Sequence, residues 1–146
     1  MSGPDATTPE VHQRPLLIVP PQINKYYVFD LSPAKSIVAW SLGSGVQTFV
    51  ISWRNPAREQ AAWGLDAYVG ALEEAVDAMR EITSSPDVNV WGACSGGITL
   101  TAFLGYLAAR RERKVHSATL AVCVLDMSTI QQTTPGLFMT PATIEA

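Results

Sequence analysis

The sequence predicts an α/β fold built on a parallel sheet with helices on both faces. Short apolar runs alternate with longer segments of helical spacing, in the order strand, helix, strand, helix, strand, helix, strand. Each pair of consecutive strands is joined by a connection of helical length, which parallel strands require. The length of 146 residues suits one domain.

Four apolar runs predict the strands, at residues 16–19, 46–53, 88–91 and 118–125. The first, Leu-Leu-Ile-Val, is stopped at once by Pro20-Pro21, and the second is rich in β-branched and aromatic residues. Runs of this kind, without polar alternation, are typical of strands buried on both faces.

Three helices are expected between the strands, at residues 32–42, 65–82 and 98–109. Ser32-Pro33 is a helix-start signal, since a hydroxyl caps the first turn and proline needs no N–H there. In residues 65–82 the apolar side chains recur at helical spacing and the charged ones occupy the opposite face.

Composition excludes several classes of protein. With 47% hydrophobic and 16% charged residues the chain is in the globular range. A net charge of −3 gives no reason to expect a nucleic-acid partner, and no apolar stretch is long enough to span a bilayer. Two cysteines exclude a disulfide framework and favour a reducing, cytoplasmic compartment. No metal site is predicted from the spacing of His, Cys, Asp and Glu residues.

Three regions are expected along the chain. Residues 1–14 are rich in proline and threonine and predict a flexible N-terminal arm without the apolar core of a signal peptide. Residues 15–126 form the α/β core. Residues 127–146 form a Thr/Pro-rich tail.

A glycine-rich turn follows the third predicted strand and precedes a helix. Its sequence, Gly92-Ala93-Cys94-Ser95-Gly96-Gly97, matches the nucleophile-elbow pattern G-x-S-x-G of α/β-hydrolases, with cysteine in place of serine. Such a turn projects its central side chain, and the glycines at 92 and 96 remove Cβ atoms that would collide with neighbouring elements. A helix N-terminus also favours a thiolate. Cys94 is therefore the candidate nucleophile; the alternative is a turn that only packs, with an inert core thiol.

An acyl-transfer nucleophile needs amide donors for the oxyanion of its tetrahedral intermediate. The backbone N–H of Ser95 is in position for this role, and the loop after the first strand, at Gln22-Ile23, is expected to supply a second one, assigned to Ile23.

The chain offers no clear general base. His12 lies in the predicted arm, and His116 precedes the fourth strand, at the opposite edge of the sheet from Cys94. Asp126 follows that strand on the edge of Cys94, where it would either orient a base or cap a turn. Since α/β-hydrolases place the acid and then the histidine after the nucleophile, the chain is expected to be a fragment of a longer enzyme.

Several segments together resemble the polyhydroxyalkanoate (PHA) synthases, acyltransferases with an α/β-hydrolase-like fold and a catalytic cysteine. The resemblance covers about residues 15–126, and its matching segments are Pro-Pro-Gln-Ile-Asn-Lys-Tyr-Tyr (20–27), Phe-Asp-Leu-Ser-Pro (29–33), Ser-Trp-Arg-Asn-Pro (52–56), Trp-Gly-Leu (63–65), the elbow (92–97) and Val-Leu-Asp (124–126). Gln22 and the Gly-Ala-Cys-Ser-Gly-Gly elbow are more similar to the medium-chain (class II) branch.

The resemblance implies an activity. Cys94 would attack an (R)-3-hydroxyacyl-CoA thioester and release CoA, and a further hydroxyl activated by histidine would extend the growing polyester. No cofactor is implied, because the CoA thioester is the substrate. The family works as a dimer at a cytoplasmic polymer granule. By the same pattern the acid and histidine lie beyond residue 146, Asp126 has no triad role, and the tail begins the region that covers the active site.

Two further residues are candidates for substrate binding. Asn24 lies in the first matching segment, and Arg54 lies at the carboxyl end of a strand, where it would contact CoA phosphates or fix the neighbouring loop. Cys123 and the four tryptophans are expected in the core. Two other functions stay open: a cysteine-elbow hydrolase of the thioesterase type, and a non-catalytic granule-associated module.

Overall fold

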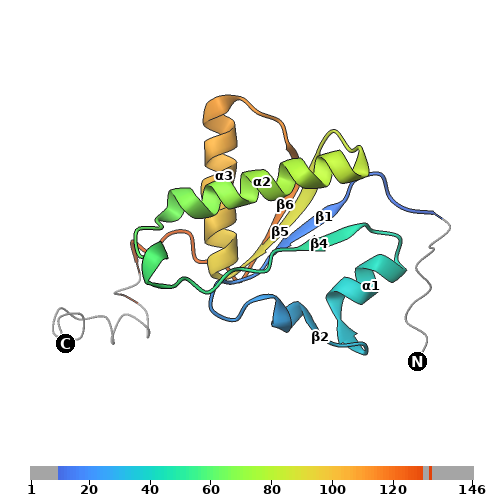
Figure 1. Ribbon diagram of the computed structural model, residues 1–146, viewed down its shortest axis with the longest axis horizontal. Helices are drawn as coiled ribbons and strands as arrows, with labels where there is room; N and C mark the ends of the chain where they lie inside the picture. Colours follow the sequence, from blue (N-terminus) through green and yellow to red (C-terminus); the bar gives the residue numbers. More distant parts are fainter. Residues whose placement is uncertain (1–9, 130–131, 133–146) are drawn as a thin grey trace.

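In the part of the chain that the structure describes, four parallel strands form the main sheet. The computed structural model describes residues 10–129 and residue 132. The strands are β1 (Leu16–Val19), β4 (Thr48–Val50), β5 (Val88–Ala93) and β6 (Val115–Ala121), in the spatial order β4-β1-β5-β6 (Figure 1). Every neighbouring pair is parallel. The predicted parallel α/β sheet is confirmed.

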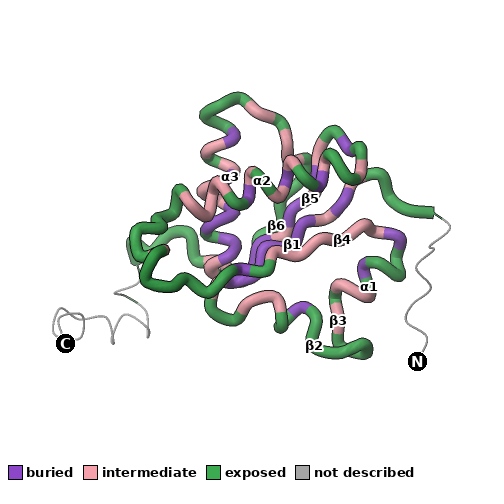
Figure 2. Tube along the Cα trace, viewed as in Figure 1, coloured by how far each residue is buried: buried purple, intermediate pink, exposed green. Residues whose placement is uncertain are grey.

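The main core lies on one face of the sheet, under α2 (Leu65–Thr83) and α3 (Ser95–Arg110). Side chains of β1 and β5 point into it alternately, so Leu17 and Val90 pack with Phe103 of α3. Figure 2 shows the buried residues along β1 and β5 and at intervals along both helices. The two long helices lie within one or two residues of the predicted 65–82 and within three of 98–109.

The other face carries a smaller core. Ile18 of β1 and Ala93 of β5 pack there against Phe29, from the short 3-10 helix η1 (Tyr26–Phe29). The short helix α1 (Ile37–Gly43) adds Val38 to this cluster. Helices thus cover both faces, but unequally.

The predicted helix start at Ser32-Pro33 is wrong. Residues 30–36 form a small hairpin instead, with β2 (Asp30–Ser32) paired antiparallel to β3 (Lys35–Ser36). The helix begins later, where the Ser36 side chain accepts a hydrogen bond from the Ala39 N–H at 2.8 Å. The reason is local: Ser-Pro suits the first two positions of a β-turn as well as it suits a helix N-terminus.

Three predicted strands differ at their ends. The strand expected over 88–91 continues as β5 to Ala93. The strand expected over 46–53 is confined to β4, and a 3-10 turn, η2 (Arg58–Gln60), follows it. The strand expected over 118–125 runs from Val115 to Ala121, and Val122, with a positive φ of 49°, leaves the extended conformation of a strand. Cys123 therefore lies beyond the strand, not within it.

A partly buried ammonium ties α2 to the segment that enters β6. Lys114 Nζ lies 2.9 Å from Glu73, 2.8 Å from Asp77 and 3.0 Å from Glu112, which we call the Lys114 cluster. The hydrogen bonds of Lys114 lower the pKa of Glu73 and Asp77, and those of Arg110 and Lys114 lower the pKa of Glu112. The same carboxylates raise the pKa of Lys114, although its burial opposes this.

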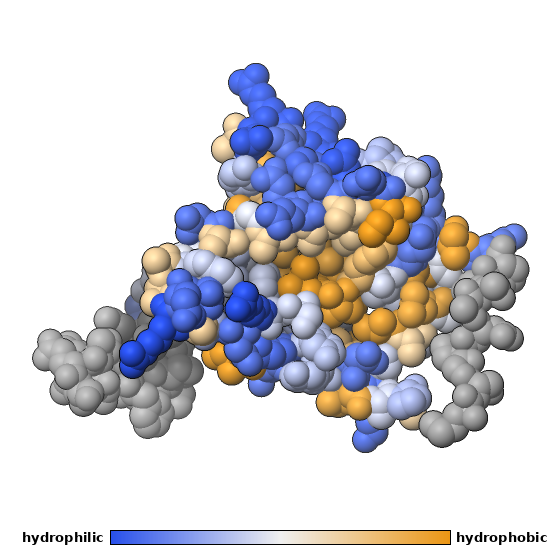
Figure 3. All heavy atoms as spheres, in the orientation of Figure 1, coloured by the Kyte–Doolittle hydropathy of each residue, from blue (hydrophilic) through white to orange (hydrophobic). Residues whose placement is uncertain are grey.

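The surface keeps more apolar side chains than the sequence suggests. Of the four tryptophans expected in the core, Trp53 is buried, but Trp40 is 73% exposed and Trp63 is also exposed. Figure 3 shows apolar side chains gathered between α2 and α1, over the edge strand β4. Among the helices described, none is both long and apolar enough to cross a membrane.

The two ends of the chain lie partly outside the described residues. Of the predicted arm, residues 10–14 are described, and they contact the fold: the His12 N–H donates to Gly45 O at 2.8 Å, and Arg14 pairs with Asp87. The predicted tail is described only over 127–129 and at 132, so its expected role in covering the active site concerns residues outside the described part.

Candidate active site at the end of β5

The elbow joins β5 to α3 through a single strained residue. Cys94 caps α3 with φ 51° and ψ −126°, a conformation that costs an L-residue roughly 1–3 kcal/mol. Its N–H makes the last rung of the sheet, to Ala121 O at 3.0 Å, and its carbonyl accepts from the Gly97 N–H at 3.0 Å. With the backbone held on both sides, the thiol is exposed. Among the described residues, Cys94 therefore does not pack in the core.

Three glycines make the elbow possible, each for a different neighbour. A Cβ on Gly92 would stand 2.7 Å from Gly97 Cα in the facing helix. A Cβ on Gly96 would stand 2.7 Å from the Pro20 carbonyl carbon and closer still to the Val19 and Pro20 oxygens. A Cβ on Gly97 would overlap the sulfur of Cys123. The expectation that positions 92 and 96 must lack Cβ atoms is confirmed.

The two predicted oxyanion donors come from elements in direct contact. Among the described residues, neither the Ser95 N–H nor the Ile23 N–H donates to a protein acceptor. Ser95 starts α3, whose first N–H groups are free by helix geometry. The preceding residue of the loop, Gln22, donates its own N–H to Ser95 Oγ at 3.3 Å, which puts the loop beside the helix start.

A hollow of about 330 Å³ lies beside Cys94. Its walls are apolar, from Val28, Phe29, Ile37 and Trp91, and Asn24 supplies a polar side chain. The structure thus brings together two of the predicted site residues, Cys94 and Asn24.

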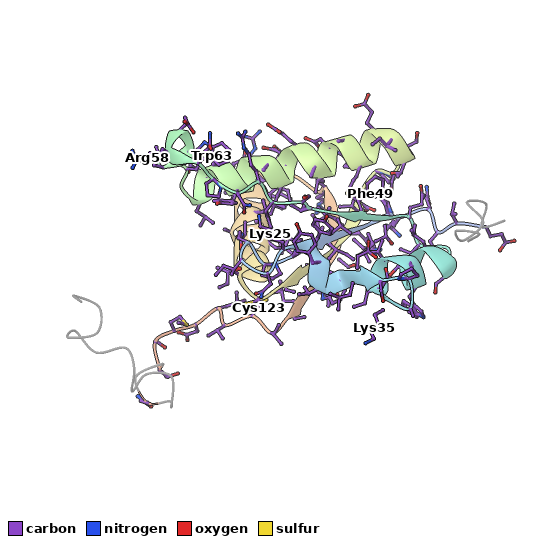
Figure 4. All side chains as sticks on the ribbon, turned by 60° about the horizontal axis from the view of Figure 1, so that its bottom comes forward. Lys25, Lys35, Phe49, Arg58, Trp63 and Cys123 are labelled. Atoms are coloured by element: carbon purple, nitrogen blue, oxygen red, sulfur yellow. The ribbon has the colours of Figure 1, made fainter. Side chains whose placement is uncertain are left out.

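Arg54 lines a different hollow. That space, of about 370 Å³, lies at the end of β4 between Trp53, Trp63 and Tyr68 (Trp63 is labelled in Figure 4). No hollow found in the described part contains both Arg54 and Cys94.

The chain's two histidines lie far along the strands from the elbow. His12 and His116 line one hollow at the amino ends of β5 and β6, and His116 Nδ1 lies 3.7 Å from Asp87. Asp126 caps a turn: its Oδ1 accepts the Ser128 N–H at 2.8 Å, and this hydrogen bonding lowers the pKa of Asp126. Of the two roles that the sequence allowed for Asp126, the turn cap is the observed one.

Cys123 lies directly beneath the elbow (labelled in Figure 4). Its sulfur lies 3.2 Å from Ala121 O, 3.5 Å from Cys94 O and 3.7 Å from Gly92 O, and fills the space that Gly97 leaves. The sequence predicted Cys123 as a core residue within the fourth strand. The strand assignment was wrong, but the thiol is half-buried and packs against its neighbours.

The loop after β1 is tied down by side chains that the sequence reading missed. The indole Nε1 of Trp53 donates to Pro20 O at 2.7 Å, and Lys25 Nζ donates to Trp53 O at 3.0 Å (Lys25 is labelled in Figure 4). Gln22 Nε2 donates to Thr99 Oγ1 at 2.7 Å. One sequence signal existed for the last contact: Thr99 is a polar residue on the buried side of an apolar helix.

Fold and site together define a partial α/β-hydrolase-like protein with a cysteine at its nucleophile elbow. Among the described residues, no group of three or more His, Cys, Asp or Glu side chains is arranged to hold a metal ion.

Comparison with known proteins gives the family. A family model for the N-terminus of poly-beta-hydroxybutyrate polymerase (PhaC) matches residues 4–41. Poly(3-hydroxyalkanoate) polymerase 1 of Ectopseudomonas oleovorans is 57% identical over 95% of this chain and 24% of its own length. Polymerase 2 of the same organism is 49% identical over 92% and 24%, and the Cupriavidus necator polymerase subunit PhaC is 42% identical over 83% and 21%.

The chain belongs to the PHA synthase (PhaC) family. It spans about a quarter of the length of the curated relatives that it matches.

Proposed function

We propose that this chain is the part of a PHA synthase that carries the nucleophile, and that Cys94 forms the acyl-enzyme. One observation carries the proposal: the exposed thiol of Cys94 stands on a strained strand–turn–helix, beside free backbone N–H groups and an apolar hollow. A structural cysteine would have no need of that conformation.

The first step is thioester exchange. The Cys94 sulfur attacks the carbonyl carbon of an (R)-3-hydroxyacyl-CoA and a new C–S bond forms. The bond to the CoA sulfur breaks, and the proton lost from the Cys94 thiol is balanced by one taken up by the leaving sulfur, so that CoA is released as its thiol. The N–H groups of Ser95 and Ile23 stabilise the oxyanion between these events. The apolar hollow receives the acyl chain, and Asn24 contacts its polar end.

The second step extends the polymer. A hydroxyl oxygen of a monomer or chain attacks the acyl-cysteine, gives its proton to a base, and the C–S bond to Cys94 breaks. Both histidines of this chain line the hollow at the other end of the sheet. The base would therefore come from polypeptide outside this chain, and we expect the chain alone to make no polymer. For Arg54, the position in a separate hollow favours a contact with a distal part of CoA over one with the acyl group.

The setting of the reaction follows from the family. The substrate is a hydroxyacyl-CoA and the product an insoluble polyester, so we propose the cytoplasm and the polymer-granule surface as the location, with a second synthase copy as partner. No cofactor is required, because the thioester itself supplies the driving force.

A hybrid polymerase tests the proposal. In it, this chain replaces the matching segment of Poly(3-hydroxyalkanoate) polymerase 1 of E. oleovorans, of which 57% is already identical. With (R)-3-hydroxyoctanoyl-CoA, we expect CoA release and polymer with Cys94, and no covalent acylation after Cys94→Ala, with unchanged circular dichroism. Cys123→Ala is the matched control and should keep both activities. Acylation that survives in Cys94→Ala, or a folded hybrid without activity, contradicts the proposal; release of free hydroxyacid without polymer would indicate a hydrolase instead.

A further inference from the structure

We propose that Gln22 is a positioning residue, whose side chain fixes the loop after β1 against α3 and thereby holds the Ile23 N–H beside that of Ser95. The inference rests on the proposed function of Cys94. It adds a residue whose role is mechanical: Gln22 does not line the hollow beside Cys94 and is not expected to touch the acyl group.

The loop and the helix are in backbone contact where the two donors meet. No side chain fits between them, because any Cβ at Gly96 would collide with the carbonyl groups of Val19 and Pro20. At this contact Gln22 binds α3 at two points one turn apart. Its N–H donates to Ser95 Oγ at 3.3 Å, and its Nε2 donates to Thr99 Oγ1 at 2.7 Å.

The direction of these hydrogen bonds is fixed by the helix. The Thr99 hydroxyl donates to Ser95 O at 3.1 Å, so its oxygen is left as an acceptor and must be met by a donor. The amide nitrogen of Gln22 is that donor. A continuous chain therefore runs from Gln22 through Thr99 to Ser95, and such chains strengthen their members.

The side-chain amide of Gln22 also carries an energetic penalty that a role in packing alone does not explain. Among buried side-chain nitrogen and oxygen atoms of the described residues, Oε1 of Gln22 is without a partner. A buried acceptor left unsatisfied destabilises the fold, and an apolar side chain of the same shape would avoid this penalty. The chain has an amide at this position in spite of the unsatisfied acceptor, which points to the position of Nε2 as the role of the side chain.

The rest of the loop has little else to hold it on this side. Ile23 is 87% exposed and Asn24 is exposed, so their side chains contribute almost nothing to packing. On the opposite side, the loop is pinned by Trp53 and Lys25. Gln22 is thus the tether that keeps the Ile23 backbone from moving away from α3.

The test compares two reactions of Cys94: acylation, which forms an oxyanion, and alkylation by iodoacetamide, which does not. In the hybrid polymerase, Gln22→Met keeps the side-chain volume and removes both the Nε2 donor and the orphan acceptor. We expect acylation of Cys94 by (R)-3-hydroxyoctanoyl-CoA to slow roughly 10- to 100-fold, as for a displaced catalytic group. This loss should appear in kcat with KM little changed, while alkylation of Cys94 by iodoacetamide and the melting temperature stay as in the parent.

A second variant approaches the tether from the helix. Thr99→Val removes the hydrogen-bond acceptor and should likewise lower kcat for acylation with KM little changed. The double variant, with both Gln22→Met and Thr99→Val, should acylate no more slowly than either single variant, since both substitutions break the same tether. Thr101→Val is the matched control: its hydroxyl makes the same kind of helix contact, to Gly97 O at 2.9 Å, but does not reach the loop.

The outcomes distinguish this inference from the proposed function. If Gln22→Met and Thr99→Val acylate at the parent rate, the tether has no role and the inference is overturned, while Cys94 keeps its own. Equal losses in acylation and alkylation, or a lowered melting temperature in both variants, would show general destabilisation and also overturn it. If Cys94→Ala is still acylated, the proposed function itself fails.

Discussion

Gly96→Ala is the change that most directly tests the contact between the loop after β1 and α3. The new Cβ would stand 2.7 Å from the Pro20 carbonyl carbon, and both nearest groups are backbone. Carbon atoms prefer about 3.5 Å, so the helix start and the loop must separate by about 0.8 Å.

Two effects of the substitution oppose each other. Alanine stabilises a helix interior by about 1 kcal/mol over glycine, but overpacking typically costs about 1–3 kcal/mol, and here no flexible side chain can yield. The clash should win, with a lower melting temperature. The activity should suffer more than the stability, because a shift near 1 Å at an oxyanion donor costs about 100-fold.

The matched control lies on the same helix. At Gly105 an added Cβ meets nothing within 4 Å, so Gly105→Ala should raise stability by about 1 kcal/mol and leave activity unchanged. Urea unfolding of the chain and the acylation rate of the hybrid polymerase give the two readouts. A Gly96→Ala protein as stable and as active as Gly105→Ala would refute the close approach described above.

Two further predictions concern the rest of the fold. Lys114→Met should lower the melting temperature between about pH 5 and pH 10. The carboxylates of the Lys114 cluster have lowered pKa values, so their contribution to folding stability is fully present above their ordinary pKa range. That contribution is lost as the pH falls through the lowered pKa values. The raised pKa of Lys114 keeps its contribution until alkaline pH. The variant's stability should therefore change less between pH 6 and pH 3 than that of the parent, and parallel curves would count against the cluster. In the native chain, iodoacetamide should label Cys94 about tenfold faster than Cys123, since Cys94 is exposed and Cys123 packs beneath the elbow; equal rates by mass spectrometry would contradict this.

The sequence was sufficient wherever the local signal and the buried face agree. The run at residues 16–19 is bounded by proline and fills β1 without error, and α2 follows its apolar spacing to within a residue. The elbow was predictable for the same reason, since its glycines are required by sterics that any such turn shares.

The errors arose where a short motif suits two structures or where distant contacts decide. Ser32-Pro33 fits a turn as well as a helix start, and only the pairing of β2 with β3 selects the turn. Nothing local in residues 118–125 predicts the positive φ of Val122, because the strand ends where the thiol of Cys123 turns under the elbow. The Gln22–Thr99 tether joins residues 77 positions apart and has no local signal at Gln22.

The order of the strands separates the reactive part of the sheet from its margins. Within the described residues, β5 is flanked on both sides, by β1 and β6, whereas β4 and β6 are outermost and each leave one row of backbone amides and carbonyls open. Additional strands can therefore join at either flank without disturbing the bend that carries the thiol. Strands or other elements can thus be added at the two edges of the sheet during evolution while the site at the end of β5 stays the same.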